Sequence, residues 1–186
     1  MNRAIRDFVK ETVSVVLIAF VLAMILRTFV IEGRIIPTGS MLPTLQLQDR
    51  VLVNKFIYRF KEPQRGDIVV FRPPDAINAN EDYIKRVIGL PGEKVEMKNG
   101  RVYINDKPLN EPYLAENLDY EYGPVIVPED CLLVLGDNRN HSFDSHMWNA
   151  WLTKDRLKGK AFMVYWPVSH LHLLERGVSF DENTGN

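Results

Sequence analysis

Residues 12–31 form an almost continuous apolar stretch near the start of this chain of 186 residues. The stretch is about as long as a helix must be to cross a bilayer. Arg27 interrupts it near the far end, where a long basic side chain can reach the membrane interface. Arg3, Arg6 and Lys10 precede it, and positively charged flanks stay on the cytoplasmic side. The sequence therefore predicts a cytoplasmic segment over 1–10, a transmembrane anchor over 11–31 and a domain on the outer face over 32–186.

Two other interpretations of this stretch stay open. Its uninterrupted part is short, which would also suit an amphipathic or buried helix. A cleaved signal peptide is the second alternative, but residues 25–31 are bulky and offer no site of the small-x-small type. We favour the uncleaved anchor because of its hydropathy.

Charge and cysteine content exclude some classes of protein. The net charge is -1, whereas a nucleic-acid-binding domain would show a basic patch. Cys131 is the single cysteine, so no intramolecular disulfide can form. Because it lies in an apolar run, we expect a buried structural thiol.

The rest of the chain has the pattern of a β protein. No second apolar run is long enough to span a bilayer, and short apolar runs alternate with turn signals. Asn99-Gly100 favours a tight hairpin, and residues 153–157 suit a short helical turn. We expect the polar residues from about Glu175 onward to be loose. The expected strands are 51–58, 67–71, 83–88, 94–97, 101–104, 125–127, 131–135 and 160–165.

Ser40 follows the anchor by only a few residues, in a setting that suits a nucleophile. Gly39 lets the backbone turn sharply or approach a substrate, and Pro43 stiffens the loop that follows. Backbone N–H groups and the hydroxyl of Thr38 could stabilise an oxyanion. The alternative is a plain polar turn.

A serine nucleophile needs a base, and Lys85 is the candidate. In a strand Lys85 would share a face with Tyr83 and Val87, so burial would lower its pKa and a neutral amine could accept the proton of Ser40. Arg86 cannot serve, because a guanidinium stays protonated. The alternative is a lysine that protects a strand edge.

Residues 136–146 gather polar side chains after an apolar strand. A triad of Ser142 or Ser145 with Asp144 and His146 is one interpretation, but triads usually combine distant segments. A metal site from His141, His146, Asp137 and Asp144 matches no strong ligand spacing. A loop held by its own hydrogen bonds is a third possibility. In a fourth, Ser142 orients Lys85 while Asp144 and Arg139 fix the loop as a charge pair.

Taken together, these segments resemble the type I signal peptidases, the membrane-bound leader peptidases of bacteria. The resemblance runs from about Ile35 to Pro167. Its motifs are Gly-Ser-Met-Leu-Pro-Thr (39–44), Arg-Gly-Asp-Ile-Val-Val-Phe (65–71), Lys-Arg-Val-Ile-Gly-Leu-Pro-Gly-Glu (85–93) and Gly-Asp-Asn-Arg-Asn-His-Ser-Phe-Asp-Ser (136–145).

The resemblance implies a mainly β fold, with an antiparallel catalytic domain, a small inserted β region over 97–127 and one N-terminal transmembrane helix. It implies Ser40 as nucleophile, Lys85 as general base and Ser142 as the hydroxyl that positions Lys85. Thr38 would assist the oxyanion hole. Ile36, Pro37, Tyr83 and Ile84 would line the substrate pockets.

The implied reaction needs no metal or organic cofactor. The expected partners are membrane lipid and the signal peptides of exported preproteins, which carry small residues one and three positions before the cut. Such a peptide could add as a strand beside residues 83–85.

His146 and Asn149 depart from the family pattern, which often has arginine and glycine at these positions. Both changes concern details of the loop. Two rival functions remain. An autocleaving repressor with the same chemistry would need a helix-turn-helix, and none is visible. A catalytically dead membrane-tethered scaffold would not need both Ser40 and Lys85.

Overall fold

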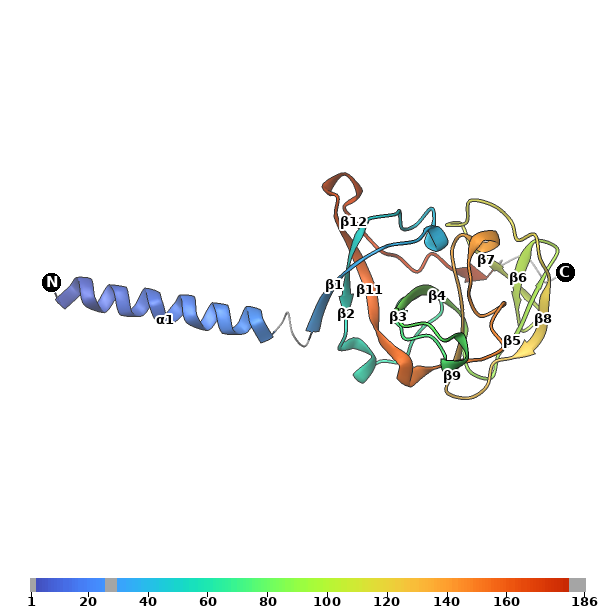
Figure 1. Cartoon of the computed structure of the whole chain (residues 1–186), viewed down its shortest axis with the longest axis horizontal. Coiled ribbons are helices and arrows are strands. Elements are labelled where there is room, and N and C mark those ends of the chain that lie inside the picture. The colour runs from blue at the N-terminus through green and yellow to red at the C-terminus, as the bar shows by residue number, and fades with distance from the viewer. Residues whose placement is uncertain (1–2, 26–29, 181–186) are drawn as a thin grey trace.

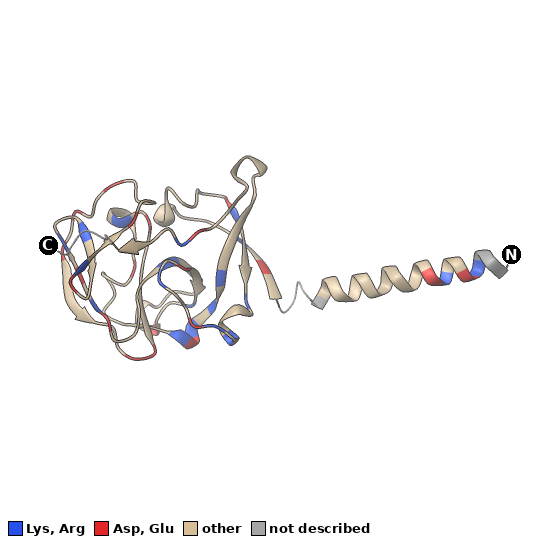
Figure 2. Cartoon of the chain, turned by 180° about the vertical axis from the view of Figure 1, so that it is seen from behind, with Lys and Arg blue, Asp and Glu red and all other residues tan. Residues whose placement is uncertain are grey.

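The computed structural model describes residues 3–25 and 30–180, which form one N-terminal helix and a β domain (Figure 1). Helix α1 spans Arg3–Ile25, and its charged residues gather at its N-terminal end (Figure 2). The side chains at 6–24 are exposed. Among the described residues, no helical segment combines the length and hydrophobicity needed to cross a bilayer. Residues 26–29 of the predicted anchor lie outside the described residues.

The larger sheet carries the segments that resemble the catalytic motifs. All of its pairings are antiparallel. Strand β12 (His172–Leu173) pairs with β11 at its side. The main order is β1 (Ile31–Ile35), β2 (Arg50–Asn54), β11 (Leu157–Trp166), β3 (Ile68–Phe71), β4 (Tyr83–Gly89), β9 (Cys131–Leu135) and β10 (Leu152–Thr153).

A second antiparallel sheet lies at the end of the domain far from α1 (Figure 1). Asn99 and Gly100 both have positive φ between two of its strands, as the hairpin prediction requires. Its order is β13 (Ser179–Phe180), β7 (Lys107–Asn110), β6 (Arg101–Ile104), β5 (Lys94–Lys98) and β8 (Tyr122–Ile126). The prediction of a mainly β fold is therefore confirmed.

Short 3-10 helices connect the strands. They are η2 (Gly39–Met41), η3 (Ile57–Arg59), η4 (Asp75–Ile77), η5 (Arg139–His141), η6 (Lys154–Arg156) and η7 (Val168–His170). η6 agrees with the short helical turn expected over 153–157.

Three apolar clusters hold the domain together. One joins β2, β3 and β11 around Met41 and Leu45, and a second packs Trp148 against β3, β4 and β9. The third lies between β9 and the second sheet and contains Cys131. The thiol is buried, as predicted, and burial raises its pKa. Burial of such side chains is the main source of stability in a domain of this size.

Two local predictions were wrong. The strand expected over 51–58 ends at Asn54, because the Asn54 side chain accepts hydrogen bonds from the N–H groups of Phe56 and Ile57 and so starts a turn. The tail after Glu175 is not loose as far as Phe180: residues 179–180 pair with β7, and Arg86 binds the carbonyl groups of Glu175 and Arg176.

Candidate active site

Ser40 lies in the short helix η2, just after the end of β1. Met41 and Leu45, which follow Ser40, are fully buried, and the Leu45 N–H donates to the Met41 carbonyl at 2.9 Å. Burial of these apolar neighbours fixes the turn that carries Ser40, whose own side chain reaches a cleft.

Lys85 reaches Ser40 from β4, where it is paired in register with Val69 of β3. Its Nζ lies 2.7 Å from Ser40 Oγ and 3.0 Å from the Ile84 carbonyl oxygen. The side chain is buried, and this burial lowers the pKa of Lys85 to about 8. The nearby charges of Asp144 and Asp137 oppose that effect, but burial is the larger influence.

A cleft of about 500 Å³ opens over these two side chains. Pro37, Thr38, Tyr83 and Ile84 contribute to its wall, together with Glu81, Asp82, Asn138, His141 and Phe143. A second hollow of about 410 Å³ adjoins it and contains Ile36 in its lining. The four residues predicted to form substrate pockets therefore line the two hollows next to Ser40.

Thr38 is exposed beside the nucleophile turn. It precedes η2 with extended backbone angles and makes no side-chain hydrogen bond to the turn. Its hydroxyl is therefore available to a ligand in the cleft.

The loop that follows β9 supports the nucleophile turn from behind. The Asn138 side chain donates to the Gly39 carbonyl at 3.0 Å, and the Asn138 N–H donates to the Ser40 carbonyl at 3.0 Å. Gly136 is needed because a Cβ there would collide with Ser142 Oγ and the Ser40 carbonyl. The role of Asn138 was not predicted, although its motif is visible in the sequence, because only the fold brings Asn138 next to Gly39.

Asp144 and Ser142 lie in the same loop, away from the cleft lining. Asp144 accepts a hydrogen bond from the Gly136 N–H at 2.8 Å and lies 2.7 Å from His146 Nδ1. The His146 ring stacks on Tyr120 with centroids 4.1 Å apart. The buried Ser142 hydroxyl has no hydrogen-bond partner among the described residues, so a contact with Lys85 stays a prediction.

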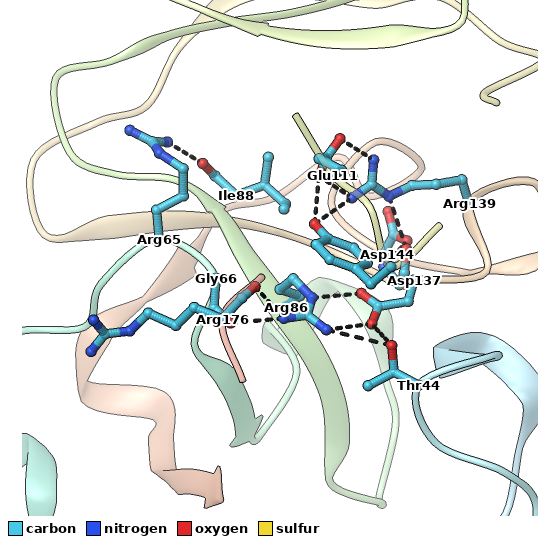
Figure 3. Close-up of polar contacts among 12 residues, drawn as sticks. Thr44, Arg65, Gly66, Arg86, Ile88, Glu111, Asp137, Arg139, Asp144 and Arg176 are labelled. Carbon is cyan, nitrogen blue, oxygen red and sulfur yellow. Dashed lines mark hydrogen bonds and ion pairs between the residues drawn. The ribbon is translucent and has the colours of Figure 1, made fainter. Parts of the chain in front are cut away.

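Two interpretations of this loop do not match the structure. The expected charge pair between Arg139 and Asp144 was wrong, because Arg139 binds both carboxylate oxygens of Glu111, at 2.9 and 2.6 Å (Figure 3). The triad within the loop lacks its serine: Asp144 contacts His146, but the Ser142 hydroxyl has no partner among the described residues and Ser145 Oγ accepts the Val134 N–H. Within residues 3–25 and 30–180, no three His, Cys, Asp or Glu side chains are arranged to hold a metal ion.

A buried ion pair joins β4 to this loop (Figure 3). Arg86 donates to both carboxylate oxygens of Asp137, at 2.8 and 2.6 Å, and Thr44 donates to Asp137 at 2.5 Å. The three segments that carry Ser40, Lys85 and Asn138 are thereby linked through one carboxylate.

Comparison with known proteins identifies the family. The model of "Signal peptidase, peptidase S26" matches residues 9–166. A probable signal peptidase I-2 from Synechocystis sp. is 52% identical over 159 residues, which are 84% of this chain and 72% of that protein. Signal peptidase I S from Bacillus subtilis is 38% identical over 181 residues, covering 91% of this chain and 96% of that protein. A crystal structure of a signal peptidase I from Enterococcus faecalis has a TM-score of 0.47 at 34% identity and covers 54% of this chain and 97% of that one. By the extent of the family match and the identity to these relatives, the chain belongs to the signal peptidase I family, peptidase S26.

Proposed function

We propose that this serine endopeptidase removes signal peptides from exported preproteins with Ser40 as nucleophile and Lys85 as general base. The observation that carries the assignment is the 2.7 Å contact between Lys85 Nζ and Ser40 Oγ at the floor of an open cleft. Acyl transfer to a serine requires a base within hydrogen-bond distance of its hydroxyl group.

In the first step, Ser40 Oγ attacks the carbonyl carbon of the scissile peptide bond while neutral Lys85 accepts the hydroxyl proton. Lys85 then gives this proton to the leaving amine, the C–N bond breaks, and the signal peptide stays attached to Ser40 as an ester.

In the second step, a water molecule takes the place of the departed amine. Lys85 accepts one of its protons, the resulting hydroxide attacks the ester, and Ser40 leaves with the proton that Lys85 returns. The products are the signal peptide with a free carboxylate and the mature protein with a free amino group.

Neighbouring groups have supporting roles in this proposal. The exposed hydroxyl of Thr38 and the backbone N–H of Ser40 would donate to the oxyanion as it forms. Ser142 would position Lys85, and Asp144 would hold the loop through the Gly136 N–H. Asn138 would fix the nucleophile turn through the carbonyl groups of Gly39 and Ser40.

Membership of the signal peptidase family implies association with a membrane, and we propose that residues 11–31 form the anchor. The support is the apolar sequence of 12–31 together with the exposed apolar side chains of α1, among them Leu17 and Phe20. Arg3, Arg6 and Lys10 would keep the N-terminus cytoplasmic. The catalytic domain would then face the outer side, where exported preproteins emerge, and confinement to one membrane would raise their effective concentration.

Cleavage of a preprotein by the full-length enzyme in liposomes tests the proposal. We expect Ser40→Ala to reduce processing by at least about 10⁴-fold, since loss of a nucleophile removes the covalent route. Ser169→Ala, which changes an exposed serine in η7, is the matched control and should process normally. Substantial cleavage by a folded Ser40→Ala enzyme would remove Ser40 from the role of nucleophile.

A further inference from the structure

The two hollows beside Ser40 share a ridge. Both are lined by Pro37, Glu81, Asp82, Tyr83 and Ile84. Ser40 and Lys85 line only the first hollow, and Ile36 lines only the second. A peptide cut at Ser40 that occupies both hollows must therefore cross this ridge with the residues that precede the scissile bond.

An extended peptide crosses such a ridge in a defined way. Successive side chains point to opposite faces, so residues one and three before the cut can enter the two hollows while residue two points away from their floor. Residue two therefore meets only those ridge side chains that extend outward to solvent.

Glu81 is the ridge residue that offers a free charge. Its side chain is exposed, and it has no hydrogen-bond or ion-pair partner among the described residues. Asp82 differs, because Arg34 lies 3.0 Å and Lys158 lies 2.7 Å from its carboxylate. Arg34 also contacts Glu32 at 2.8 Å.

Among the described residues, the other charged side chains around the second hollow are in ion pairs, and Glu81 is not. Arg34 contacts Glu32 and Asp82, Lys158 contacts Asp82, and Lys55 contacts Glu32. In the first hollow, Lys85 is directed at Ser40, and His141 is the titratable group in the lining besides Lys85 and the shared ridge residues. A substrate side chain that points outward from the ridge thus meets one unpaired carboxylate.

We propose that Glu81 is a specificity-determining residue that favours substrates with a basic side chain at the second position before the cut and disfavours acidic ones. This inference rests on the proposed function, because it requires that signal peptides are cut at Ser40. Lysine and arginine have long side chains that can reach a carboxylate at the ridge while the peptide backbone stays in the cleft.

A set of three fluorogenic peptides tests the inference with the full-length enzyme in detergent. The peptides carry alanine at positions one and three before the cut and differ only in lysine, glutamine or glutamate at position two. For an exposed charge pair we expect the lysine peptide to exceed the glutamate peptide in kcat/KM by about three- to fivefold at low salt. The ratio should decrease toward one at about 0.5 M salt, because screening weakens exposed pairs.

Substitution of Glu81 should change this ratio specifically. We expect a ratio near one in Glu81→Gln and a reversed ratio in Glu81→Lys. Glu129→Gln, which removes an exposed carboxylate outside both hollows, should keep the wild-type ratio.

The possible failures are distinguishable. A wild-type enzyme without charge preference, or a preference that survives Glu81→Gln, would overturn the role of Glu81 while cleavage of the glutamine peptide still upholds the peptidase activity. Loss of all cleavage in Glu81→Gln would also overturn it, since a selector of charge is not needed for the glutamine peptide. If the wild type cleaves none of the peptides at any salt concentration, the proposed function itself fails.

Discussion

Arg86 and Asp137 form a bidentate ion pair that is almost completely shielded from solvent, with side-chain exposures of 1% and 0%. The Arg86 guanidinium also donates to the carbonyl groups of Gly66, Glu175 and Arg176 and lies over the Tyr113 ring, with 3.8 Å to the centroid. Although the preceding residue in β4 is the candidate base, Arg86 itself takes no part in the proposed chemistry. Its role is to hold the strand, the nucleophile turn and the supporting loop together.

We predict that Asp137→Asn strongly destabilises the protein. The substitution leaves the Arg86 charge buried without its partner, which typically costs about 3–5 kcal/mol. Thermal unfolding followed by circular dichroism measures the effect. Asp106→Asn is the control, because Asp106 pairs with Lys94 at the surface, where a pair contributes about 0–1 kcal/mol. Equal stability losses in the two variants would show that the buried pair has no special importance.

Gly136→Ala should strongly reduce activity and lower stability. A Cβ at this position would collide with the Ser142 side chain and the Ser40 carbonyl, so the nucleophile turn and the loop would have to separate. Overpacking of this kind costs about 1–3 kcal/mol, and we expect peptide cleavage to fall by about 100-fold, since small displacements of a nucleophile are costly.

The control for this variant is Gly92→Ala. Gly92 has a φ of +76°, but a Cβ there meets only Glu129 Oε1 at 3.7 Å. Gly92→Ala should therefore lose some stability to backbone strain while it keeps its activity. Normal cleavage by Gly136→Ala would mean that the loop and the turn need not stay in contact.

His146 stands where the family often has arginine, and its contact with Asp144 yields a third prediction. His146→Ala removes one of the partners of Asp144 and the stacking on Tyr120. We expect kcat for peptide cleavage to fall about tenfold with little change in KM, because the loop behind Ser40 loses its fixed position. His146→Arg should keep at least half of the activity, since arginine can both pair with a carboxylate and stack on an aromatic ring.

His172→Ala, at an exposed position in β12, serves as the control for these two variants. Equal activity of His146→Ala and the wild type would show that the backbone N–H groups of Gly136 and His146 hold Asp144 well enough without the imidazole.

Local patterns were sufficient to predict the strands around Lys85. The apolar run in residues 83–88 and the turn signals around it predict that strand, and the Asn99-Gly100 pair predicts a hairpin. Strand β7 was missed because it is short and contains Pro108, which cannot donate to a sheet ladder. Its partner β13 was missed because the tail looks polar, and nothing in a polar run indicates which backbone groups will pair.

Long-range polar contacts could not be predicted from the sequence. Arg139 was paired with the nearby Asp144, whereas the fold brings Glu111 from 28 residues away to its guanidinium. Arg86 and Asp137 are 51 residues apart, and a chain with 24 acidic residues offers many possible partners. Ser40 and Lys85 differ from these pairs because the residues around them and the family resemblance both indicated their roles, and those roles stay predictions.

The last prediction concerns the protonation of Lys85. The lowered pKa of about 8 means that the amine is mostly protonated at neutral pH and becomes able to accept a proton as the pH rises. We therefore expect kcat/KM to fall about tenfold for each pH unit below about 8 and to level off above it, because only the neutral amine acts as a base. Lys85→Arg should be inactive at every pH, since a guanidinium does not lose its proton and its burial in a site suited to a neutral amine is costly.

One fluorogenic signal-sequence peptide measured from pH 6 to pH 10 tests both parts of this prediction. Lys98→Arg, at a partly exposed lysine remote from the cleft, controls for the change of side chain and should reproduce the wild-type profile. If Lys85 only protected a strand edge, arginine would be a mild substitution and the acidic limb would remain in the variant. An active Lys85→Arg enzyme with an unchanged acidic limb of the pH profile would therefore exclude Lys85 as the base. The buried contact with Ser40 predicts the opposite outcome: a folded Lys85→Arg variant without activity, and an acidic limb only in the enzymes that retain Lys85.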